Sequence, residues 1–380
     1  MRARDNGLPL MRKLRVAIVA PSLRFLGGQA IQAQRLISAW RDDPDVEAWL
    51  VPVDPLPPGP FKHAVKVKYL RTLAIETTYL ARLLRELRRA DILHVFSASY
   101  TSFLLAPLPA MLLGRALGRP VILNYRSGQA PYHLRRSRLA RAAIARADRS
   151  IVPSRFLVDV FSSFGLNAVS VPNVVDFERF KFRERRPLRP RLLSNRNFEP
   201  LYNVACTLRA FELVQRRRPD AELTVVGGGS LDRELRMLAR LLGLRNVTFV
   251  GRVPPEKMPA YYEANDLYVQ SPNIDNMPGS VLEAFASGLP VVATAAGGVP
   301  AILTDHVHGL LAPLDDHQAL ASHILRLLDD PELALTLTRN AYGTCETYRW
   351  SNIRDQWLSH YRDLALVPEQ RPVVEALGSG

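Results

Sequence analysis

The amino-acid sequence predicts an α/β protein made of two domains of similar size, each built on a parallel sheet. The 380 residues exceed what one ordinary hydrophobic core accommodates. Short apolar runs alternate with longer helical patterns, which is the rhythm of strand–helix–strand units. The charged, proline-punctuated stretch DFERFKFRERRPLRPR, at residues 176–191, interrupts this rhythm, and the rhythm restarts after it.

The first domain is expected at residues 13–178, after a flexible tail at residues 1–12. Its opening run LRVAIVAP, at residues 14–21, is short and continuously apolar, as in a strand that is buried on both faces. Similar runs predict strands at 47–53, 91–97, 120–125 and 149–154, with helices between them that include 29–40 and 63–89.

The second domain is expected at residues 191–346, after a linker at residues 179–190. Its strands are predicted at 191–195, 222–229, 246–251, 266–271, 290–294 and 309–313. The chain is then expected to be helical from about 331 to 365 and to end in a disordered tail at 367–380. Because ligands bind beyond the carboxyl ends of parallel strands, we expect functional residues in the loops that follow the strands.

The composition indicates a globular protein in a reducing compartment. Hydrophobic residues make up 47% of the chain and charged residues 23%, as in soluble domains. Cys206 and Cys345 have no metal-ligand spacing and form no disulfide framework, so a cytoplasmic location is expected. No window reaches the roughly 18 to 20 apolar residues of a membrane span. The short apolar run near the N-terminus is expected to be a strand and not a signal peptide.

Positive charge is concentrated in the first half of the chain. The net charge is +14, and residues 1–180 hold 27 basic and 13 acidic side chains, whereas residues 181–380 hold 23 of each. This asymmetry predicts a polyanionic partner for the first half, namely nucleic acid, phospholipid or an anionic acceptor. Aromatic side chains do not alternate with the basic ones and no nucleic-acid motif is present, which argues against nucleic acid.

Two segments with helical patterns carry many of these basic residues. Arg82, Arg85 and Arg89 recur at i, i+3 and i+7, and a second group comprises Arg135, Arg136, Arg138 and Arg141. Near an anionic bilayer each basic residue contributes about 1 kcal/mol of binding. We therefore expect a peripheral protein on the inner membrane face, and a solvated basic surface without a partner is the alternative.

Two glycine-rich turns follow predicted strands. Gly27 and Gly28 precede the helix at 29–40, where backbone N–H groups can approach a phosphate, and a plain tight turn is an equal alternative. Their spacing is neither that of a dinucleotide-binding fingerprint nor that of a Walker loop. The run VVGGGSLDREL, at 225–235, also lacks the fingerprint spacing, so we interpret it as a turn beside the site with Ser230 or Asp232 near a helix cap.

The stretch SPNIDNMPGSVLEAFASGLPVVAT, at residues 271–294, combines a polar loop, a short helix and a buried strand. The helix is expected to start near Ser280, so the N–H groups of residues 279–282 can hold a phosphate. Glu283 lies one turn into this helix and can accept hydrogen bonds from ribose hydroxyls, while Asp275 faces the other end of a bound nucleotide sugar. In the structural alternative, Glu283 supports the helix N-terminus and Asp275 caps a turn.

The run IDNMPGSVLEAFASGLPVVATAAGGVPAIL, which begins at Ile274, resembles the signature of the retaining family-four glycosyltransferases (glycosyl transferases group 1). Their motif is an acidic residue, seven residues and a glutamate, matched here by Asp275, one methylene shorter than the usual glutamate, and Glu283. GGQAIQAQRL at 27–36 and the runs at 145–180 and 225–272 also resemble the family. The resemblance covers about residues 14–365.

This resemblance implies the GT-B fold, in which two Rossmann-like domains face each other across an interdomain cleft. It also implies a terminal helix, at 347–366, that packs back on the first domain. The implied reaction is a retaining transfer of a sugar from a UDP- or GDP-linked donor to an acceptor hydroxyl, without a metal ion or another cofactor. The acceptor, held by the first domain, would be lipid-linked, a glycan or anionic, as in the synthesis of cell-surface glycans or glycolipids.

The family motif also implies roles for individual residues. Glu283 would bind the donor ribose, Asp275 would lie by the donor sugar, and Arg196 would bind the donor phosphate. Further donor-binding positions are Gly27, Gly28, Asn203, Pro278, Gly279, Ser280, Val281 and Leu282.

Two departures from the family pattern concern the strength of catalysis. Leu201 stands where the family has a lysine, and either neutral hydrogen bonds from Tyr202 and Asn203 or another basic residue that reaches in would have to replace it. Arg126 stands where many members have a histidine, and it is predicted to be catalytic together with Arg196, Asp275 and Glu283. An arginine stays protonated and cannot act as a base, but it can contact the donor phosphate or an acidic acceptor. His133 is expected to be solvated. A catalytically weak nucleotide-sugar-binding relative that serves as a partner subunit is the alternative function.

Overall fold

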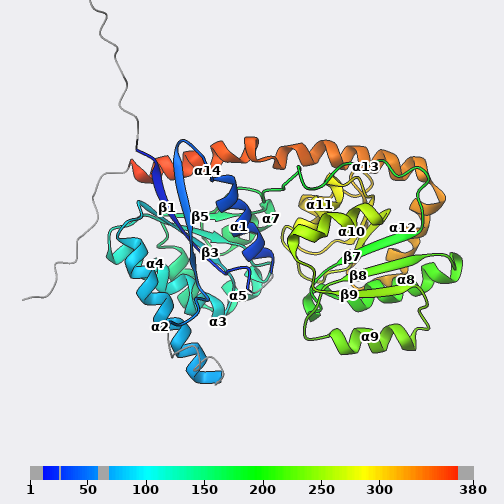
Figure 1. The fold of residues 1–380 in the computed structure, drawn as a ribbon, viewed down its shortest axis with the longest axis horizontal. Coiled ribbons are helices and arrows are strands. Elements are labelled where there is room, and N and C mark those ends of the chain that lie inside the picture. Colours follow the sequence, from blue (N-terminus) through cyan, green and yellow to red (C-terminus); the bar gives the residue numbers. More distant parts are fainter. Residues whose placement is uncertain (1–11, 25–26, 59–67, 367–380) are drawn as a thin grey trace, which may run out of the picture. The chain divides into compact units, whose positions relative to one another are not determined.

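The computed structural model describes residues 12–24, 27–58 and 68–366. These residues form two six-stranded sheets with helices (Figure 1), which confirms the predicted two-domain α/β fold. The described residues divide into two compact units, of which the first comprises those up to residue 125, 139–151 and 354–366 and the second comprises residues 126–138 and 152–353. The tails predicted at both ends lie outside the described residues, except for residue 12.

The first sheet has the strand order β2-β1-β3-β4-β5-β6. Its strands are β1 (Leu14–Ala20), β2 (Val46–Pro52), β3 (Ile92–Ser97), β4 (Val121–Tyr125), β5 (Arg149–Val152) and β6 (Val169–Ser170). The helices that precede β7 in the chain are α1 (Gly28–Ala39), α2 (Lys68–Leu87), α3 (Thr101–Leu105), α4 (Pro107–Ala116), α5 (Ala130–Arg136), α6 (Arg138–Ile144) and α7 (Arg155–Ser163), of which α5 and α7 belong to the second unit. Strands β3 and β4 are buried along their whole length, as continuous apolar runs predict for parallel strands.

The second sheet has the strand order β12-β11-β10-β7-β8-β9. Its strands are β7 (Arg191–Asn195), β8 (Glu222–Val226), β9 (Val247–Gly251), β10 (Leu267–Gln270), β11 (Val291–Thr294) and β12 (Leu310–Ala312). The helices that follow β7 in the chain are α8 (Val204–Arg217), α9 (Asp232–Leu241), α10 (Met258–Ala264), α11 (Gly279–Ala286), α12 (His317–Asp329), α13 (Pro331–Cys345) and α14 (Trp350–Ala365), with short 3₁₀ turns η2 (Pro200–Tyr202), η3 (Pro255–Lys257), η4 (Val299–Ala301) and η5 (Glu346–Tyr348).

The core of the second unit has two layers because successive strand residues face opposite sides of the sheet. Leu192 belongs to a cluster with residues of α8, α9 and α12. Its neighbour Leu193 belongs to a separate cluster with residues of α10 and α11. Figure 1 shows α10 and α11 on one side of this sheet and α8 and α9 on the other. The helix that carries Glu283 is therefore anchored on one face of the sheet.

Both sheets reverse their strand order beside their first strand. Strand β7 lies between β8 and β10, and strand β1 lies between β2 and β3. At such a reversal the loops after neighbouring strands diverge, and the crevice at their carboxyl ends is the usual ligand site of an open α/β sheet. The reversal between β7 and β10 is where the predicted site residues of the second unit follow their strands.

The predicted strands are all present, and their bounds agree with the sequence pattern to within a few residues. Strand β6 was not predicted, because two residues are too few to show a pattern. The helix predicted at 63–89 corresponds to α2, which ends at Leu87, and residues 63–67 lie outside the described part. The segment 179–190, predicted as a linker, contains no helix or strand, yet Phe180 and Arg185 within it are buried.

Residues 354–365 of α14 pack within the first unit. The hydroxyl of Tyr361 lies 2.8 Å from Nδ1 of His94, a fully buried residue on β3. The ring centroid of Trp357 lies 4.7 Å from that of His94. This part of the last helix is therefore packed on the first sheet through the aromatic side chains of Trp357 and Tyr361, which contact His94 on β3.

A buried carboxylate ties the same helix to the turn before β2. Arg354 donates from Nε to Oδ2 of Asp43 at 2.7 Å, and from a second nitrogen to Asp45 at 2.6 Å. Desolvation by itself would raise the pKa of Asp43, but hydrogen bonds from Arg354 and from the backbone N–H groups of Asp45 and Val46 outweigh it, so the pKa is lowered. The charged form of Asp43 is thus the form that stabilises the fold.

We expect Arg354→Ala to lower the free energy of unfolding by about 2 to 3 kcal/mol at pH 7, because Asp43 would stay charged and nearly buried without its partner. The group has a lowered pKa in the folded state, so this contribution is present above about pH 4 and is lost at more acidic pH as Asp43 takes up a proton. Urea unfolding of both proteins at pH 7 and at pH 3 measures the difference.

The control is Arg362→Ala, which removes a more exposed contact with Asp45 at 2.7 Å. Exposed ion pairs contribute about 0 to 1 kcal/mol, so this variant should change stability little. Equal losses in the two variants would contradict the role given to the buried Asp43 carboxylate.

Candidate active site

The strand-order reversal between β7 and β10 brings two loops together. Arg196 directly follows β7, and the loop at residues 271–278 leads from β10 into α11. The backbone N–H of Asn273 donates to the carbonyl of Leu201 at 2.9 Å, which ties this loop to the turn that follows β7. The predicted residues of the second unit, from both loops, are thereby gathered at one edge of the sheet.

Arg196 is the centre of the first group of contacts. Its guanidinium forms an ion pair with Asp275 and donates to Oγ of Ser280 at 3.2 Å. Cζ, the central carbon of the guanidinium, also lies 4.2 Å from the ring centroid of Tyr202. The sequence predicts Arg196, Asp275 and Ser280 as separate ligand contacts, and the structure shows in addition that Arg196 contacts the other two.

Charge compensation keeps this nearly buried arginine ionised. Burial is the largest single influence and by itself would lower the pKa of Arg196, but the negative charge of Asp275 and the nearby tyrosines together outweigh it and the pKa is raised. Nε of Arg196 is buried and has no hydrogen-bond partner among the described residues. A guanidinium that is held this way, with one nitrogen unsatisfied, is suited to bind an anionic group.

Glu283 is the centre of the second group. The hydroxyl of Tyr262, on α10, donates to Oε2 of Glu283 at 2.8 Å and accepts from Nδ2 of Asn195 at 2.8 Å. Burial and the charge of Glu283 raise the pKa of Tyr262 well above its ordinary value, so the phenol remains a proton donor. The carboxylate is thus oriented by a chain of hydrogen bonds from the end of β7.

The predicted site residues did not include Tyr262, which donates to Glu283, or Asn195, which donates to Tyr262. Asn195 is the last residue of β7 and directly precedes Arg196, which is a position where parallel strands present ligand-binding side chains. That signal was available. Tyr262 lies in an ordinary amphipathic helix, and its spacing from Glu283 in the sequence gives no sign of their contact.

Helix α11 presents an uncapped N-terminus beside these groups. It begins at Gly279 after Pro278, and no side chain caps its first turn. The side chains of Val281 and Leu282 are fully buried, and the N–H of Val281 donates to the carbonyl of Pro278 at 3.2 Å, so the N–H groups that can face a ligand are those before Val281, at the very start of the helix. Uncapped N–H groups and the helix dipole together favour an anion at this end.

Two glycines allow the loop before α11 to pack closely. The backbone N–H of Gly298 donates to the carbonyl of Asp275 at 3.2 Å. A Cβ atom at Gly298 would overlap the carbonyl oxygen of Asn276, and one at Gly297, which has a φ of 51°, would overlap that of Asp275. The position of Asp275 therefore depends on the absence of side chains at this glycine pair.

The three-glycine turn after β8 supports the loop that carries Arg196. A Cβ atom at Gly227 would overlap the carbonyl oxygen of Arg196, and one at Gly229 would overlap that of Phe198. Glu199 closes the turn by accepting from the backbone N–H of Ser230 at 3.0 Å and from its hydroxyl at 2.6 Å. The predicted turn beside the site is present, and its carboxylate partner, Glu199, was not foreseen.

Asn203 is engaged within the second unit. It has a left-handed backbone with φ of 44°, and its side chain caps α8 by accepting from the N–H of Cys206. The same side chain donates to Asp315 at 2.9 Å and to Asn273 at 3.2 Å. The structure therefore shows a loop-stabilising role for Asn203, and its donor-binding role remains a prediction.

Arg126 belongs to the second unit and reaches the loop before α11 through Asn173. Its guanidinium contacts Oδ1 of Asn173, and Nδ2 of Asn173 donates to the carbonyl of Met277 at 2.9 Å. Desolvation lowers the pKa of Arg126 to about 9. It is still a cation at neutral pH, as expected of a group that cannot act as a base.

The solvated state expected for His133 is wrong. This residue lies on α5 and is buried, and desolvation lowers the pKa of its imidazole. The reason is that α5 turns this side chain inward, which a single histidine in a charged stretch does not reveal.

The glycine pair Gly27–Gly28 lies in the first unit, after β1 at the other strand-order reversal. Helix α1 begins at Gly28, and Gly27 is extended and supplies no side-chain cap. A Cβ atom at Gly28 would meet nothing within 4 Å, so space is open beside the helix start. This turn is compatible with the phosphate-binding prediction and with the plain-turn alternative.

Within the described residues, no group of three or more His, Cys, Asp or Glu side chains is arranged to hold a metal ion. The acidic pairs after Leu314 and Leu328 cap helices. Asp316 accepts from two N–H groups at the start of α12, and Asp330 accepts from the N–H of Leu333 at the start of α13.

Two family models together match most of the chain. The model described as Glycosyltransferase Family 4 matches residues 26–179, and the model described as Glycosyl transferases group 1 matches residues 176–344. The chain belongs to the family-four GT-B glycosyltransferases. The resemblance inferred from the sequence is thereby confirmed.

Characterised relatives extend this assignment. The chain is 28% identical over 312 residues to a GDP-mannose-dependent phosphatidylinositol monomannoside mannosyltransferase of Mycolicibacterium smegmatis, covering 75% of this chain and 80% of that one. It is 35% identical over 174 residues to a D-inositol 3-phosphate glycosyltransferase of Corynebacterium urealyticum, covering 43% of this chain and only 41% of the relative.

Solved structures agree with the fold. HepE from Anabaena, in complex with UDP-glucose, matches 92% of this chain and 99% of its own with a TM-score of 0.73 and 19% identity. Sucrose-phosphate synthase from Thermosynechococcus elongatus matches 93% of this chain and 99% of its own with a TM-score of 0.70 and 20% identity. At these identities the likeness establishes the GT-B fold alone.

We expect Gly298→Ala to lower the free energy of unfolding by about 1 to 3 kcal/mol, because the new methyl group overlaps the backbone that holds Asp275. The matched control is Gly343→Ala on α13, where a Cβ atom meets nothing within 4 Å and the helix gains up to about 1 kcal/mol. Chemical unfolding of both variants measures the contrast. A stabilised Gly298→Ala protein would contradict the packing described for the loop.

Proposed function

We propose that this glycosyltransferase moves a sugar from a nucleoside diphosphate sugar, linked to UDP or GDP, to an acceptor hydroxyl with retention of anomeric configuration. The observation that carries the proposal is the group formed by Arg196, Asp275, Ser280 and the Tyr262-oriented Glu283 at the β7–β10 reversal. The group combines a cation, an uncapped helix start and a carboxylate, which suit a diphosphate and a ribose at one site.

In the proposed mechanism the second unit stabilises the leaving nucleoside diphosphate. Glu283 binds the ribose hydroxyls, and the N–H groups at the start of α11 lie against the phosphates. The guanidinium of Arg196 shifts from Asp275 toward the phosphate oxygen on which charge develops, and Asp275 is then available to the hydroxyls of the donor sugar. Stabilisation that grows as the bond breaks lowers the barrier.

The sugar transfer itself needs no protein nucleophile in this proposal. The bond between the anomeric carbon and the diphosphate oxygen breaks, and the acceptor oxygen bonds to the same face of that carbon. The proton of the acceptor hydroxyl passes to the departing phosphate oxygen. Arg126, a cation tied through Asn173 to the loop before α11, is proposed to contact the donor phosphate or an anionic acceptor. No metal ion or other cofactor takes part.

The names of two relatives support a phosphate-bearing acceptor, which in one case is a lipid. One is named for phosphatidylinositol monomannoside and another for D-inositol 3-phosphate, and both of these acceptors carry phosphate. We propose a lipid-linked, glycan or anionic acceptor for this chain, in cell-surface glycan or glycolipid synthesis, at the cytoplasmic face of a membrane.

The surface of the first unit supports the membrane part of the proposal. Helices α2 and α4 contact each other, and α3 directly precedes α4 (Figure 1). Their outer surfaces expose Leu70, Leu73, Leu84, Leu104, Leu105 and Leu112. Arg82 and Arg85 of α2 are exposed as well, whereas Arg89 lies beyond the helix end and contacts Glu86 and the ring of Trp49. No helix in the described part is long and apolar enough to cross a membrane.

The alternative is a binding subunit with weak or no turnover. It is favoured by Leu201 in place of a lysine and by Arg126 in place of a histidine. One exposed cation lies near this edge of the sheet even though the lysine is absent. It is Arg252, which packs along the Gly228 backbone in the turn after β8. Nucleotide binding without donor hydrolysis or transfer would favour the binding subunit over the enzyme.

We expect the purified protein to bind UDP or GDP, and Glu283→Gln to weaken this binding by about tenfold to hundredfold because a charge-assisted hydrogen bond is lost. Isothermal titration measures the dissociation constants. The control is Glu222→Gln on β8, where an exposed carboxylate pairs with Arg191 at 3.6 Å. Failure of the folded protein to bind either nucleotide, or an equal effect of the two variants, would refute the donor-site assignment.

We expect the protein to co-sediment with vesicles that contain phosphatidylglycerol but not with pure phosphatidylcholine vesicles. Replacing Arg82 and Arg85 by glutamate should weaken binding at least about tenfold, since each basic residue contributes about 1 kcal/mol. Leu70→Ser with Leu73→Ser should weaken it too, because these side chains are 52% and 63% exposed and available to the bilayer. The control, Leu241→Ser on α9, removes a leucine that is 77% exposed in the second unit and should have no effect.

A further inference from the structure

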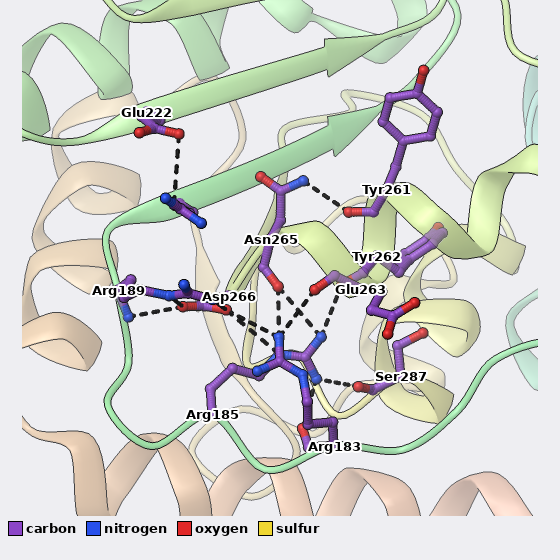
Figure 2. A network of polar contacts seen from close by, with 11 residues as sticks. Arg183, Arg185, Arg189, Glu222, Tyr261, Tyr262, Glu263, Asn265, Asp266 and Ser287 are labelled. Atoms are coloured by element: carbon purple, nitrogen blue, oxygen red, sulfur yellow. Dashed lines mark hydrogen bonds and ion pairs between the residues drawn. The ribbon is translucent and has the colours of Figure 1, made fainter.

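The segment that follows the first sheet is held on the second unit by one buried carboxylate. Asp266, which precedes β10, is fully buried and accepts from Arg183 at 3.3 Å and from Nε and the backbone N–H of Arg189 at 2.8 Å and 3.0 Å. Arg185 lies 3.9 Å from the same carboxylate. Figure 2 shows the three arginines converging on this residue, and we call these four side chains the connector clamp.

Arg185 differs from the other arginines of the clamp in burial and in partners. Its side chain is 2% exposed, against 43% for Arg183 and 45% for Arg189. Its guanidinium donates to backbone carbonyls, of which Tyr262 is 2.8 Å away and Asn265 is 3.3 Å away, and it also donates to the carbonyl of Ser287 (Figure 2). The N–H groups of Arg185 thus donate to backbone carbonyls, and its side chain has almost no contact with solvent.

Two of the carbonyls that Arg185 binds, those of Tyr262 and Ser287, lie on α10 and at the end of α11, the helices that carry Tyr262 and Glu283. Tyr262 lies on α10, and its hydroxyl donates to Oε2 of Glu283. Ser287 is the C-terminal cap of α11, and its own N–H donates to the carbonyl of Glu283 at 3.0 Å. A cation at the C-terminal end of a helix also satisfies terminal carbonyls and complements the helix dipole.

The packing at this point leaves little room for adjustment. Gly288 follows the end of α11 with a φ of 71°, and a Cβ atom there would lie 2.6 Å from the carbonyl oxygen of Arg183. The N–H of Arg183 donates to the carbonyl of Ser287 at 3.3 Å. The backbone around Arg185 and the end of α11 are therefore in direct contact, so a change at Arg185 is passed to α11.

We propose that Arg185 is a positioning residue for Glu283. By holding the carbonyls of Tyr262 and Ser287 with one planar guanidinium, it fixes α10 relative to α11 and keeps the Tyr262 hydroxyl on the Glu283 carboxylate. A lysine would keep the charge but could not span these carbonyls in the same fixed geometry. The inference rests on the proposed role of Glu283 in binding the donor ribose.

The experiment compares two ligands that differ only in the ribose hydroxyls. Dissociation constants are measured by titration for the nucleoside diphosphate that the protein prefers, UDP or GDP, and for its 2′,3′-dideoxy form. The ratio of the two constants reports the ribose contact alone, because general damage to the site weakens both ligands equally. The proteins are wild type, Glu283→Gln, Arg185→Lys and the control Arg186→Lys, whose arginine is in the same segment but is 58% exposed.

We expect the wild type to bind the dideoxy form at least about tenfold more weakly, and Glu283→Gln to remove most of this ratio. Arg185→Lys should reduce the ratio about threefold or more, and Arg186→Lys should leave it unchanged. If Glu283→Gln removes the ratio but Arg185→Lys leaves it unchanged, only the positioning role of Arg185 is overturned. An unchanged ratio in Glu283→Gln overturns the ribose assignment itself, so the two failures are distinguishable.

A second variant covers the case in which Arg185→Lys does not fold. Arg189→Gln removes two side-chain contacts with Asp266 at an exposed position and leaves the guanidinium of Arg185 in place. It should reduce the ratio in the same direction by a smaller factor, because Asp266 is then less firmly held beside Arg185. A folded Arg189→Gln protein with the ratio of the wild type would count against the connector clamp as a determinant of Glu283.

Discussion

The pairing of β7 with β10 is the constraint on which the candidate site depends. The two strands are far apart in the sequence but lie side by side in register, with Leu267 opposite Leu192. Because the pairing is parallel, their carboxyl ends meet at one edge of the sheet. Arg196 leaves that edge after β7, and the loop with Asp275 leaves it after β10. Any sequence that preserved these loops but broke the pairing would separate the cation from the carboxylates.

Buried charge is the second constraint, and the second unit meets it in two places. Near the ligand edge, Arg196 is paired with Asp275, and behind α11 three arginines surround the fully buried Asp266. A buried ion without a partner costs several kcal/mol, at roughly 3 to 5 when one member of a pair is removed. The two sets differ in one respect that matters for function. Arg196 has an unsatisfied buried nitrogen, whereas Arg185 is fully committed to backbone carbonyls.

The first unit combines a basic character with exposed leucines, and helix α2 carries both features. Arginine side chains alone are compatible with a solvated surface. Leucines exposed on neighbouring helices are less easily explained, because single exposed leucines are ordinary but a group of them marks a surface that another phase or molecule covers. The anionic bilayer that we propose as a partner would account for both features, and some relatives are named for lipid and phosphate-bearing compounds.

The sequence by itself determined the fold class, the strands and the family, and it named Arg196, Asp275 and Glu283. Strand patterns and the motif are local, so the residues that define each of them are neighbours in the chain and can be recognised from the sequence alone. It did not determine that Arg196 contacts Asp275, that Tyr262 and Asn195 orient Glu283, that His133 is buried, or that the charged stretch at 179–190 is packed through Arg185. Each of these depends on which strands become neighbours and which helix face turns inward. Those choices are made by packing between segments distant in the chain, and only the tertiary structure records them.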